Sequence, residues 1–262
     1  MNTHYPSDLT DAQWACLCRH LPLAAGLRRR RHSLRRVFDA IFYLLRTGCQ
    51  WRFLPADFPP WQAVYYHFRR FRLTGIWAGI LAALRQAERV RVGKDSQPSA
   101  AIIDAQSVKT VEESAPISGY DGHKRVKGRK RHLLVDTLGL PISISVTPAN
   151  THDKVGAWRL LAGLKPLVPR LAKIWADGAY TSGKLARWCE QYGRWDLEIV
   201  GRDPETTGFA VQPRRWVVER TFAWLVRNRR LRIDYERKVQ TSETLIEVAM
   251  IRLLLRRLAK SE

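Results

Sequence analysis

The sequence predicts an α/β protein, in which an all-α N-terminal domain precedes a mixed sheet flanked by helices. Two observations support this fold class. Up to about residue 95, apolar residues recur at the three- and four-residue spacing of helices. Beyond a polar, proline-containing stretch at 93–99, short apolar runs of strand character alternate with helical segments. We therefore expect one domain over residues 1–95 and a second over residues 100–262.

Four helices are expected in the N-terminal domain. The first begins at Thr10, where Thr-Asp-Ala-Gln is a capping box, and the second follows Ser33 and ends at Gly48. A third helix begins after the proline pair at 59–60, and Gly75 separates it from the fourth.

The second domain begins with an apolar run at 100–103 that leads into Asp104. Two β-rich segments, 131–137 and 142–147, flank a turn and predict a hairpin. The remaining segments are a helix at 153–164, a strand at 172–176, a helix at 182–192, a strand at 197–200, and helices at 214–229 and 242–258. A meander of three strands followed by alternating helices and strands is the order of an RNase H-like sheet.

The charge of the chain indicates a polyanionic partner. Lys and Arg number 45 against 24 Asp and Glu, a formal net charge of +21. Both the first 99 residues and the remainder are basic, so no charged tail accounts for the excess. Nucleic acid is the common partner of such proteins, although a ribosomal or other RNA-binding factor explains the charge equally well.

Other sequence features exclude several classes of protein. No apolar run reaches the roughly 18 residues that a membrane span needs, and no signal peptide is visible. The four cysteines match no zinc-binding pattern. We therefore expect a cytoplasmic protein with no membrane partner.

Three acids are the candidate catalytic and metal-binding residues. Asp104 and Asp177 each follow a short apolar strand, and ligands gather where strands of an α/β sheet end. Glu219 lies within an apolar helical segment, an unfavourable place for an unpaired carboxylate. Carboxylate oxygens suit Mg²⁺, and two such ions activate a nucleophile and stabilise a leaving oxygen in phosphodiester chemistry.

Each acid also has a purely structural interpretation. An aspartate after a strand is often a turn former or a helix cap, and Glu219 could pair with Arg215 four residues earlier. Asp121 and Asp136 are better placed in turns, and Asp153 at a helix start, than as metal ligands.

Four motifs occur in fixed order, at 103–109, 118–139, 176–180 and 214–224; the second is SGYDGHKRVKGRKRHLLVDTLG. They resemble those of DDE transposases of bacterial insertion sequences, in particular insertion-sequence family five. Segments 9–14 and 48–55 are similar to the helical domain of the same family, so the resemblance spans nearly the whole chain.

The resemblance implies that Asp104, Asp177 and Glu219 are the first, second and third acids of the triad, with Mg²⁺ as cofactor and Mn²⁺ as a substitute. It also implies binding to the terminal inverted repeats, cleavage at the element's ends, and joining of the 3′ ends to target DNA. The partners are double-stranded DNA and a second copy of the chain, as a homodimer or larger assembly, at the nucleoid.

The fourth motif departs from a related signature, Tyr-x2-Arg-x3-Glu-x6-Lys, of a neighbouring transposase family. Arg215 and Glu219 match its Arg and Glu, whereas Gln212 and Val226 occupy the Tyr and Lys positions. No role is therefore expected for the side chains of Gln212 and Val226.

Basic residues supply the predicted DNA contacts. Beside Arg215, they form an arginine run and a cluster before the hairpin: Arg28, Arg29, Arg30, Arg31, Lys124, Arg125, Lys127, Arg129, Lys130 and Arg131. Phosphate contact is the functional interpretation, and a solvated loop or strand edge is the alternative. Base recognition is expected from a helix at 61–72 in a helix-turn-helix-like domain, through Gln62, Arg69 and Arg70.

Two other functions stay open for the same residues. A structure-selective nuclease would share the fold but lack end recognition and strand transfer. A non-catalytic DNA-binding regulator, such as a domesticated or inactive transposase, would share the basic surfaces. The presence of all three acids favours an active enzyme, because a decayed copy usually loses one of them.

Overall fold

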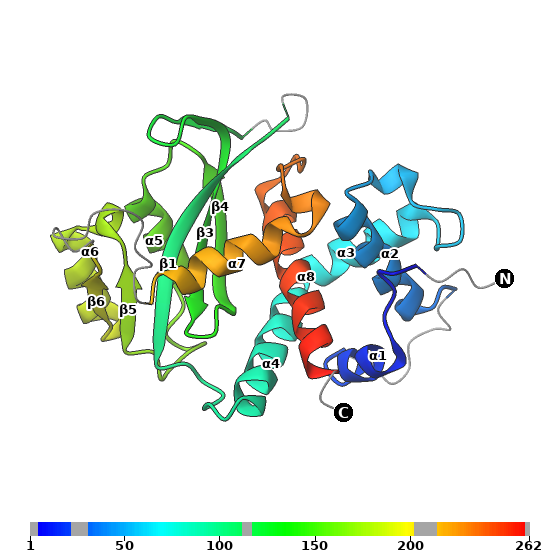
Figure 1. Cartoon of the computed structure of the whole chain (residues 1–262), viewed down its shortest axis with the longest axis horizontal. Coiled ribbons are helices and arrows are strands. Elements are labelled where there is room, and N and C mark those ends of the chain that lie inside the picture. The colour runs from blue at the N-terminus through cyan, green and yellow to red at the C-terminus, as the bar shows by residue number, and fades with distance from the viewer. Residues whose placement is uncertain (1–4, 22–30, 112–116, 202–213, 260–262) are drawn as a thin grey trace. The chain divides into compact units, whose positions relative to one another are not determined.

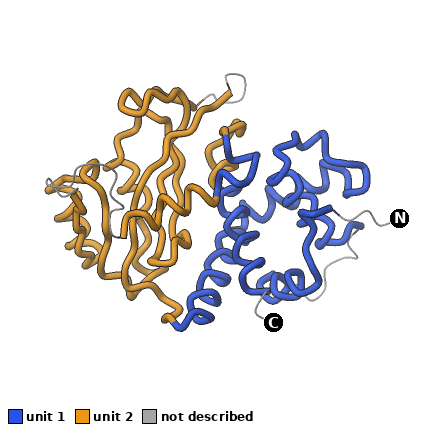
Figure 2. The backbone as a smooth tube through the Cα atoms, viewed as in Figure 1, with its two compact units in different colours: residues 1–93, 225–232, 244–262 blue, residues 94–224, 233–243 orange. Residues whose placement is uncertain are grey.

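A computed structural model describes residues 5–21, 31–111, 117–201 and 214–259. The chain forms two compact units (Figure 2). Unit 1 comprises 1–93, 225–232 and 244–262, and unit 2 comprises 94–224 and 233–243. The division after residue 93 lies beside the predicted boundary. The two C-terminal segments of unit 1 were expected in the second domain, so the first unit is assembled from three separate stretches of chain.

The N-terminal helices of unit 1 begin where the sequence signals predict. They are α1 (Asp11–Cys18), α2 (Leu34–Thr47), α3 (Trp61–Leu73) and α4 (Ile76–Arg91), with a 3₁₀ turn, η1 (Trp51–Phe53), after α2. The capping box is present, because the Gln13 amide donates to the Thr10 hydroxyl and the Thr10 amide donates to the Gln13 side chain. Gly48 ends α2 with φ +77°, a left-handed conformation that favours glycine.

Aromatic rings fill the core of unit 1. Trp77 is fully buried, packs edge-on against Phe38 and Phe71 at 5.2 and 5.6 Å between ring centroids, and donates its indole N–H to the Phe68 carbonyl. The C-terminal segments join the same unit, where the Arg230 guanidinium donates to the Cys49 carbonyl at 3.1 Å. The N-terminal helices are therefore held by residues from both ends of the sequence.

Unit 2 contains a six-stranded mixed sheet (Figure 1). Its strands are β1 (Ala100–Lys109), β2 (Gly119–Asp121), β3 (Val126–Asp136), β4 (Pro141–Pro148), β5 (Lys173–Ala176) and β6 (Asp196–Ile199). β3 pairs antiparallel with β1, β2 and β4, whereas β5 pairs parallel with both β1 and β6. The antiparallel meander followed by parallel strands confirms the predicted RNase H-like order.

Two strands are longer than predicted and one was missed. β1 continues past Asp104 to Lys109 because its pairing with β3 continues, as far as Lys109 opposite Gly128. β3 accordingly begins at Val126, inside the basic cluster. β2 was not expected, since its Asp121 was assigned to a turn. These strand segments are rich in polar and basic residues, so the alternation of apolar residues from which strands are predicted does not detect them.

Helices pack on the sheet of unit 2. The buried core joins Ile103 and Leu134 of the sheet to α5 (Asp153–Leu161) and α6 (Gly183–Trp188). A π-helical turn, η4 (Cys189–Gly193), follows α6. Of two further helices, α7 (Trp216–Val226) lies mostly in unit 2 and α8 (Val239–Leu258) mostly in unit 1, and a 3₁₀ turn, η5 (Arg229–Leu231), separates them along the chain. None of the described helices is long and apolar enough to cross a membrane.

α7, which crosses in front of the sheet in Figure 1, is tied to the turn between β3 and β4. The Thr221 hydroxyl donates to the Gly139 carbonyl at 2.7 Å, and the Arg220 guanidinium donates to the Leu138 carbonyl at 3.0 Å. The turn residue Gly139 has φ +79°, and a Cβ there would lie 2.8 Å from the Thr221 hydroxyl oxygen. The predicted hairpin turn thus fixes the helix that carries Glu219.

Close packing at Gly156 on α5 leads to a stability prediction. A Cβ at this position would lie 2.2 Å from two ring atoms of the buried His132. We expect Gly156→Ala to lower the free energy of unfolding by about 1–3 kcal/mol, because overpacking shifts the histidine or the helix. The matched control is Gly79→Ala on α4, where a Cβ meets nothing within 4 Å and helix propensity favours alanine by roughly 1 kcal/mol. Urea denaturation that gave both variants equal stability would contradict the prediction.

Candidate catalytic site and DNA interface

The sheet places Asp104 beside Asp177. Parallel pairing sets Ala100 opposite Lys173 and Ile102 opposite Trp175. Extending this register by two residues brings Asp104 opposite Asp177, which directly follows β5. The sequence predicted that Asp104 ends its own strand, but β1 continues beyond it. Asp104 lies instead at the level where the neighbouring parallel strand, β5, ends. Adjacent strands are about 4.8 Å apart, so the two carboxylates share one edge of the sheet.

The surroundings of Asp104 disfavour an isolated negative charge. Burial, together with the nearby charge of Asp177, raises the pKa of Asp104 to about 6, although the Ala105 amide donates to its carboxylate at 2.7 Å and lowers the pKa. The positive charges of Arg215 and Lys124 also lower it. Two partly exposed aspartates, where burial and mutual repulsion raise the pKa of Asp104, fit a cation with affinity for oxygen ligands.

Arg215 connects the second and third acids. Its Nη2 lies 3.5 Å from a carboxylate oxygen of Asp177 and 4.0 Å from one of Glu219. The Glu219 side chain is 59% exposed, so it lies on the solvated side of α7 and not in the apolar setting that the sequence indicated. The pairing with Arg215 that was considered as a structural alternative is therefore present, and the second and third acids are linked through one guanidinium.

A divalent cation fits the two aspartates on chemical grounds. Their donors are hard carboxylate oxygens from adjacent strands, and burial raises the pKa of Asp104 in the absence of such an ion. Within the described parts of the chain, however, no three His, Cys, Asp or Glu side chains form a group that could hold a metal. Asp104 and Asp177 are thus the candidate ligands already in place, while Glu219 faces Arg215.

The buried Tyr180 lies close to the same acids, a feature that the sequence did not reveal. Burial and then the charges of Asp104, Asp153 and Asp177 raise its pKa well above the ordinary value for tyrosine. Its hydroxyl has no hydrogen-bond partner among the described residues. Tyr180 thus provides a neutral polar group beside the acid pair.

The raised pKa of Asp104 predicts a pH-dependent effect of Asp104→Asn on stability. Well below pH 3.8 the wild-type carboxyl is neutral in both states; between pH 3.8 and about 6 the unfolded chain ionises before the folded one, so the folded state loses stability as pH rises through this window. Asparagine does not titrate. We therefore expect the melting temperature of the variant, relative to wild type, to increase between pH 4 and 6 and then level off.

Differential scanning fluorimetry in EDTA and in Mg²⁺ would measure this effect. If the two aspartates hold a cation, Mg²⁺ raises the melting temperature of the wild type above pH 6 and leaves Asp104→Asn unchanged. A difference in melting temperature that stays constant across this pH range would show that Asp104 is not held in such surroundings.

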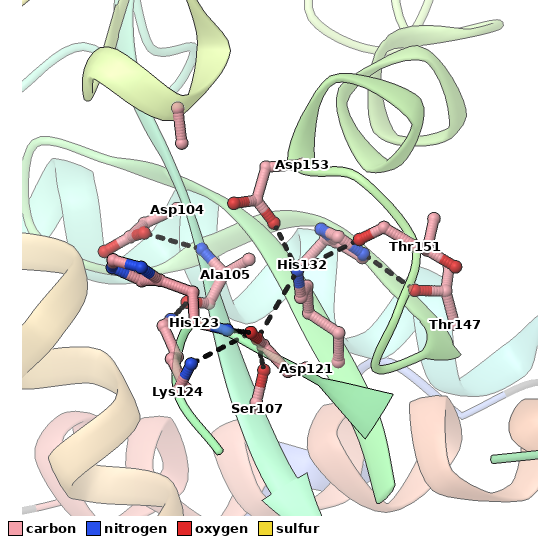
Figure 3. Close-up of polar contacts among 12 residues, drawn as sticks. Asp104, Ala105, Ser107, Asp121, His123, Lys124, His132, Thr147, Thr151 and Asp153 are labelled. Atoms are coloured by element: carbon pink, nitrogen blue, oxygen red, sulfur yellow. Dashed lines mark hydrogen bonds and ion pairs between the residues drawn. The ribbon is translucent and has the colours of Figure 1, made fainter. Parts of the chain in front are cut away.

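A second polar cluster lies beside Asp104 (Figure 3). Asp121 accepts hydrogen bonds from the Ser107 hydroxyl at 2.6 Å and from the His123 and Lys124 amides at 3.1 and 3.0 Å. Burial alone would raise the pKa of Asp121, but these hydrogen bonds and the neighbouring Lys130 lower it to about 2. The residue that the sequence assigned to a turn is a buried, ionised anchor for the 122–125 segment.

Lys130 occupies the centre of this cluster. Its ammonium lies 3.0 Å from an oxygen of Asp153 and 3.6 Å from one of Asp121, and it donates to the Thr151 carbonyl at 3.0 Å. Lys124 projects from the anchored segment and donates to the carbonyl of Ala105, next to Asp104, at 2.9 Å. Asp121 thereby helps to hold a lysine at the acid pair.

Burial removes three residues from the predicted DNA-contact set. Arg129 and Arg131 are fully buried and Lys130 is 7% exposed, so DNA cannot reach them in this conformation. Buried and exposed side chains do not alternate along this part of β3, because both edges of the strand are paired and both of its faces are covered. Lys124, Arg125 and Lys127 of the same cluster are exposed.

The other predicted DNA-contact residues lie in unit 1. Arg28, Arg29 and Arg30 lie outside the described residues, and Arg31 is exposed. Gln62, Arg69 and Arg70 are all exposed on α3, on the side opposite the buried Val64, Phe68 and Phe71. The helix predicted to read bases thus presents these side chains to solvent.

Comparisons with known proteins identify the family of the chain. A family model for the transposase DDE domain matches residues 95–254, and another, described as "Putative transposase of IS4/5 family", matches residues 9–81. The "Putative transposase for insertion sequence element IS402" of Burkholderia cepacia is 32% identical over 119 residues, which cover 42% of this chain and 55% of that protein. The chain thus spans about half the length of this curated relative. Because the DDE domain model matches more than half of the chain, the protein belongs to the DDE transposases of the IS4/IS5 type.

Proposed function

We propose that the protein cleaves DNA at the ends of its own insertion sequence and joins the freed 3′ ends to target DNA. The observation that carries the proposal is the placement of Asp104 beside Asp177 on adjacent parallel strands. Members of the DDE transposase family generally use divalent metal ions, and this carboxylate pair supplies suitable ligands.

Asp104 and Asp177 would hold Mg²⁺, or Mn²⁺ in its place, with Glu219 as the third acid. When bound, the metal supplies charge stabilisation and activates the attacking oxygen. Arg215 contacts both Asp177 and Glu219, and its guanidinium places positive charge where a DNA phosphate would bind. Lys124, next to Asp104, adds positive charge where the scissile phosphate would lie.

The reaction consists of two displacements at phosphorus. Water attacks a phosphodiester at the element's end, which breaks the bond to the 3′ oxygen and leaves a free 3′ hydroxyl. That hydroxyl then attacks a target phosphodiester in line, forms the new bond and expels the target 3′ oxygen. No covalent protein intermediate is required. Two ends must be joined, so a dimer or larger assembly acts on DNA.

Cleavage of a labelled duplex that carries the element's terminal repeat tests the proposal. We expect wild-type protein to nick this duplex in Mg²⁺ and in Mn²⁺, but not in EDTA, and to transfer the 3′ end to a plasmid. Cleavage without transfer would favour a structure-selective nuclease. Specific binding without cleavage in either metal would favour the non-catalytic regulator and overturn the proposal.

Recognition of the element's end is assigned to α3. We expect Gln62→Ala and Arg69→Ala each to reduce discrimination between the terminal repeat and a scrambled duplex by about fivefold to 150-fold, since a good base contact contributes roughly 1–3 kcal/mol. Arg187→Ala, which removes an exposed arginine of α6, is the control. Competition binding at fixed salt measures the ratio. Unchanged discrimination in both α3 variants would assign base recognition to another element.

A further inference from the structure

Two cavities adjoin β2. The inner cavity has a volume of about 480 Å³, and its lining includes Tyr120, Asp121, Lys124, Lys130, Asp153 and Ala179. The outer cavity has a volume of about 650 Å³, and its lining includes Lys109, Thr110, Ser118, Tyr120, Arg125 and Lys127. Both volumes are in the range of small-molecule sites. Tyr120 lines both cavities, so it stands at their common border.

The inner cavity borders the acid pair. Ala179 lies two residues after Asp177, and its amide donates to the Asp177 carboxylate at 2.9 Å. On the other side, Lys124 reaches the Ala105 carbonyl beside Asp104. The carboxylates of Asp121 and Asp153 in this lining are already paired with Lys130. The cavity therefore lies next to the proposed reacting phosphate, and its lining carries three lysines, Lys124, Lys130 and Lys154, against these two aspartates.

The outer cavity is cationic. Its lining holds Lys109, Arg125 and Lys127, and its described lining residues include no carboxylate. Lys127 is the cross-strand partner of Tyr120 in the pairing of β2 with β3, so the two side chains share a face of the sheet. An exposed cation thus stands beside an exposed ring.

The Tyr120 ring has no place in the core. Its residue is 58% exposed, whereas the neighbouring Asp121 is 7% exposed and anchored by four polar groups. β2 thus holds the tyrosine firmly by its backbone while leaving the ring in solvent. A fixed, exposed aromatic ring bordered by cations is the arrangement on which unpaired bases stack. In a duplex, by contrast, the faces of the bases cover one another.

We propose that an unpaired base stacks on the ring of Tyr120. This base belongs to the DNA strand that is bound at Asp104 and Asp177. The strand runs from the inner cavity over the tyrosine ring to the outer cavity, where Arg125 and Lys127 contact its phosphates. This inference rests on the proposed function, because that function brings a DNA strand to Asp104 and Asp177. The site takes single-stranded DNA, such as the end of a strand that has separated from its complement.

The test compares a fully paired terminal duplex with the same duplex extended by a short single-stranded tail. The full-length chain is measured by fluorescence anisotropy in Ca²⁺, and tails carrying 2-aminopurine report stacking by quenching. We expect wild type to prefer the tailed duplex and to quench 2-aminopurine at one tail position. Tyr120→Ala should reduce the preference by about fivefold to 150-fold, the equivalent of one base stack, and abolish the quenching. Tyr120→Phe should retain both.

Tyr192→Ala is the control, because Tyr192 is 47% exposed and lines neither cavity. Equal preference in wild type and Tyr120→Ala overturns the inference, as does a wild type that quenches at no tail position. A Tyr120→Phe variant as weak as Tyr120→Ala would assign the effect to a hydroxyl contact and overturn stacking. Failure of the proposed function is distinguishable, since wild type would then not cleave the paired duplex in Mg²⁺.

Discussion

Alanine at Asp104 or Asp177 is expected to reduce Mg²⁺-dependent cleavage of the terminal duplex on the order of a thousandfold or more. Each replacement removes one of the two carboxylates that adjacent strands place side by side. The remaining carboxylate cannot hold the cation in the position that stabilises the attacking and leaving oxygens. DNA binding should persist, because both variants make the site less negative.

Single-turnover cleavage with saturating protein measures this loss separately from binding. Asp196→Ala is the matched control, since Asp196 lies on the neighbouring β6 with its side chain 67% exposed and paired with Lys173. That variant should cleave at the wild-type rate. An Asp104 or Asp177 variant that also does so, with a normal melting temperature, would remove the pair from the mechanism.

Glu219 requires its own variant, because its pairing with Arg215 is a structural alternative to a catalytic role. Glu219→Ala should lose cleavage to the same degree if Glu219 is the third acid. Arg215→Lys separates the two roles, since it keeps a positive charge but loses the planar fork that contacts two acids. If Glu219→Ala cleaves DNA at the wild-type rate, Glu219 has no catalytic role and only forms the ion pair with Arg215 on the surface of α7.

The second large effect is expected at Arg129, which forms a fully buried ion pair with Asp234 at 3.2 Å. Its guanidinium also donates to the carbonyls of Ile117 and Arg237, and Asp234 accepts hydrogen bonds from Ser242 and Glu236. We expect Arg129→Ala to lower the free energy of unfolding by about 3–5 kcal/mol, because Asp234 is left as a buried charge without its cation.

Arg170→Ala provides the comparison on the surface. Arg170 pairs with Asp95 at 2.9 Å, but the two side chains are 50% and 51% exposed. Its loss should cost less than about 1 kcal/mol. Guanidinium denaturation of both variants tests the difference. Similar destabilisation by the two replacements would mean that the Arg129 pair contributes no more than a surface ion pair.

Arg129 also illustrates what the sequence alone could and could not predict. The partner of Arg129 lies 105 residues away, so no local pattern distinguishes it from the exposed Lys127 two positions earlier. The same reason hides the extension of β1 beyond Asp104. Helix ends, by contrast, depend on residues within one turn, and the capping box at Thr10 and the end of α2 at Gly48 are where the sequence predicts.

The candidate site was partly predictable for similar reasons. Strand character before Asp104 and Asp177 was enough to select the two acids as candidate ligands at the ends of strands of the sheet. The surroundings of the two acids could not be predicted, because they depend on side chains from several elements. Asp121 was assigned to a turn although it anchors Lys124 beside Asp104, and Glu219 was expected among apolar residues although it is exposed.

The assembly of unit 1 from residues 1–93, 225–232 and 244–262 has a consequence for the evolution of such elements. The N-terminal helices cannot be exchanged between relatives by recombination at a single junction near residue 93, because part of their unit is encoded downstream of the second unit's sheet. A viable chimaera has to inherit all three segments from one parent. End recognition, if it belongs to α3, would therefore diverge by point substitution on the exposed face of that helix more readily than by exchange of modules.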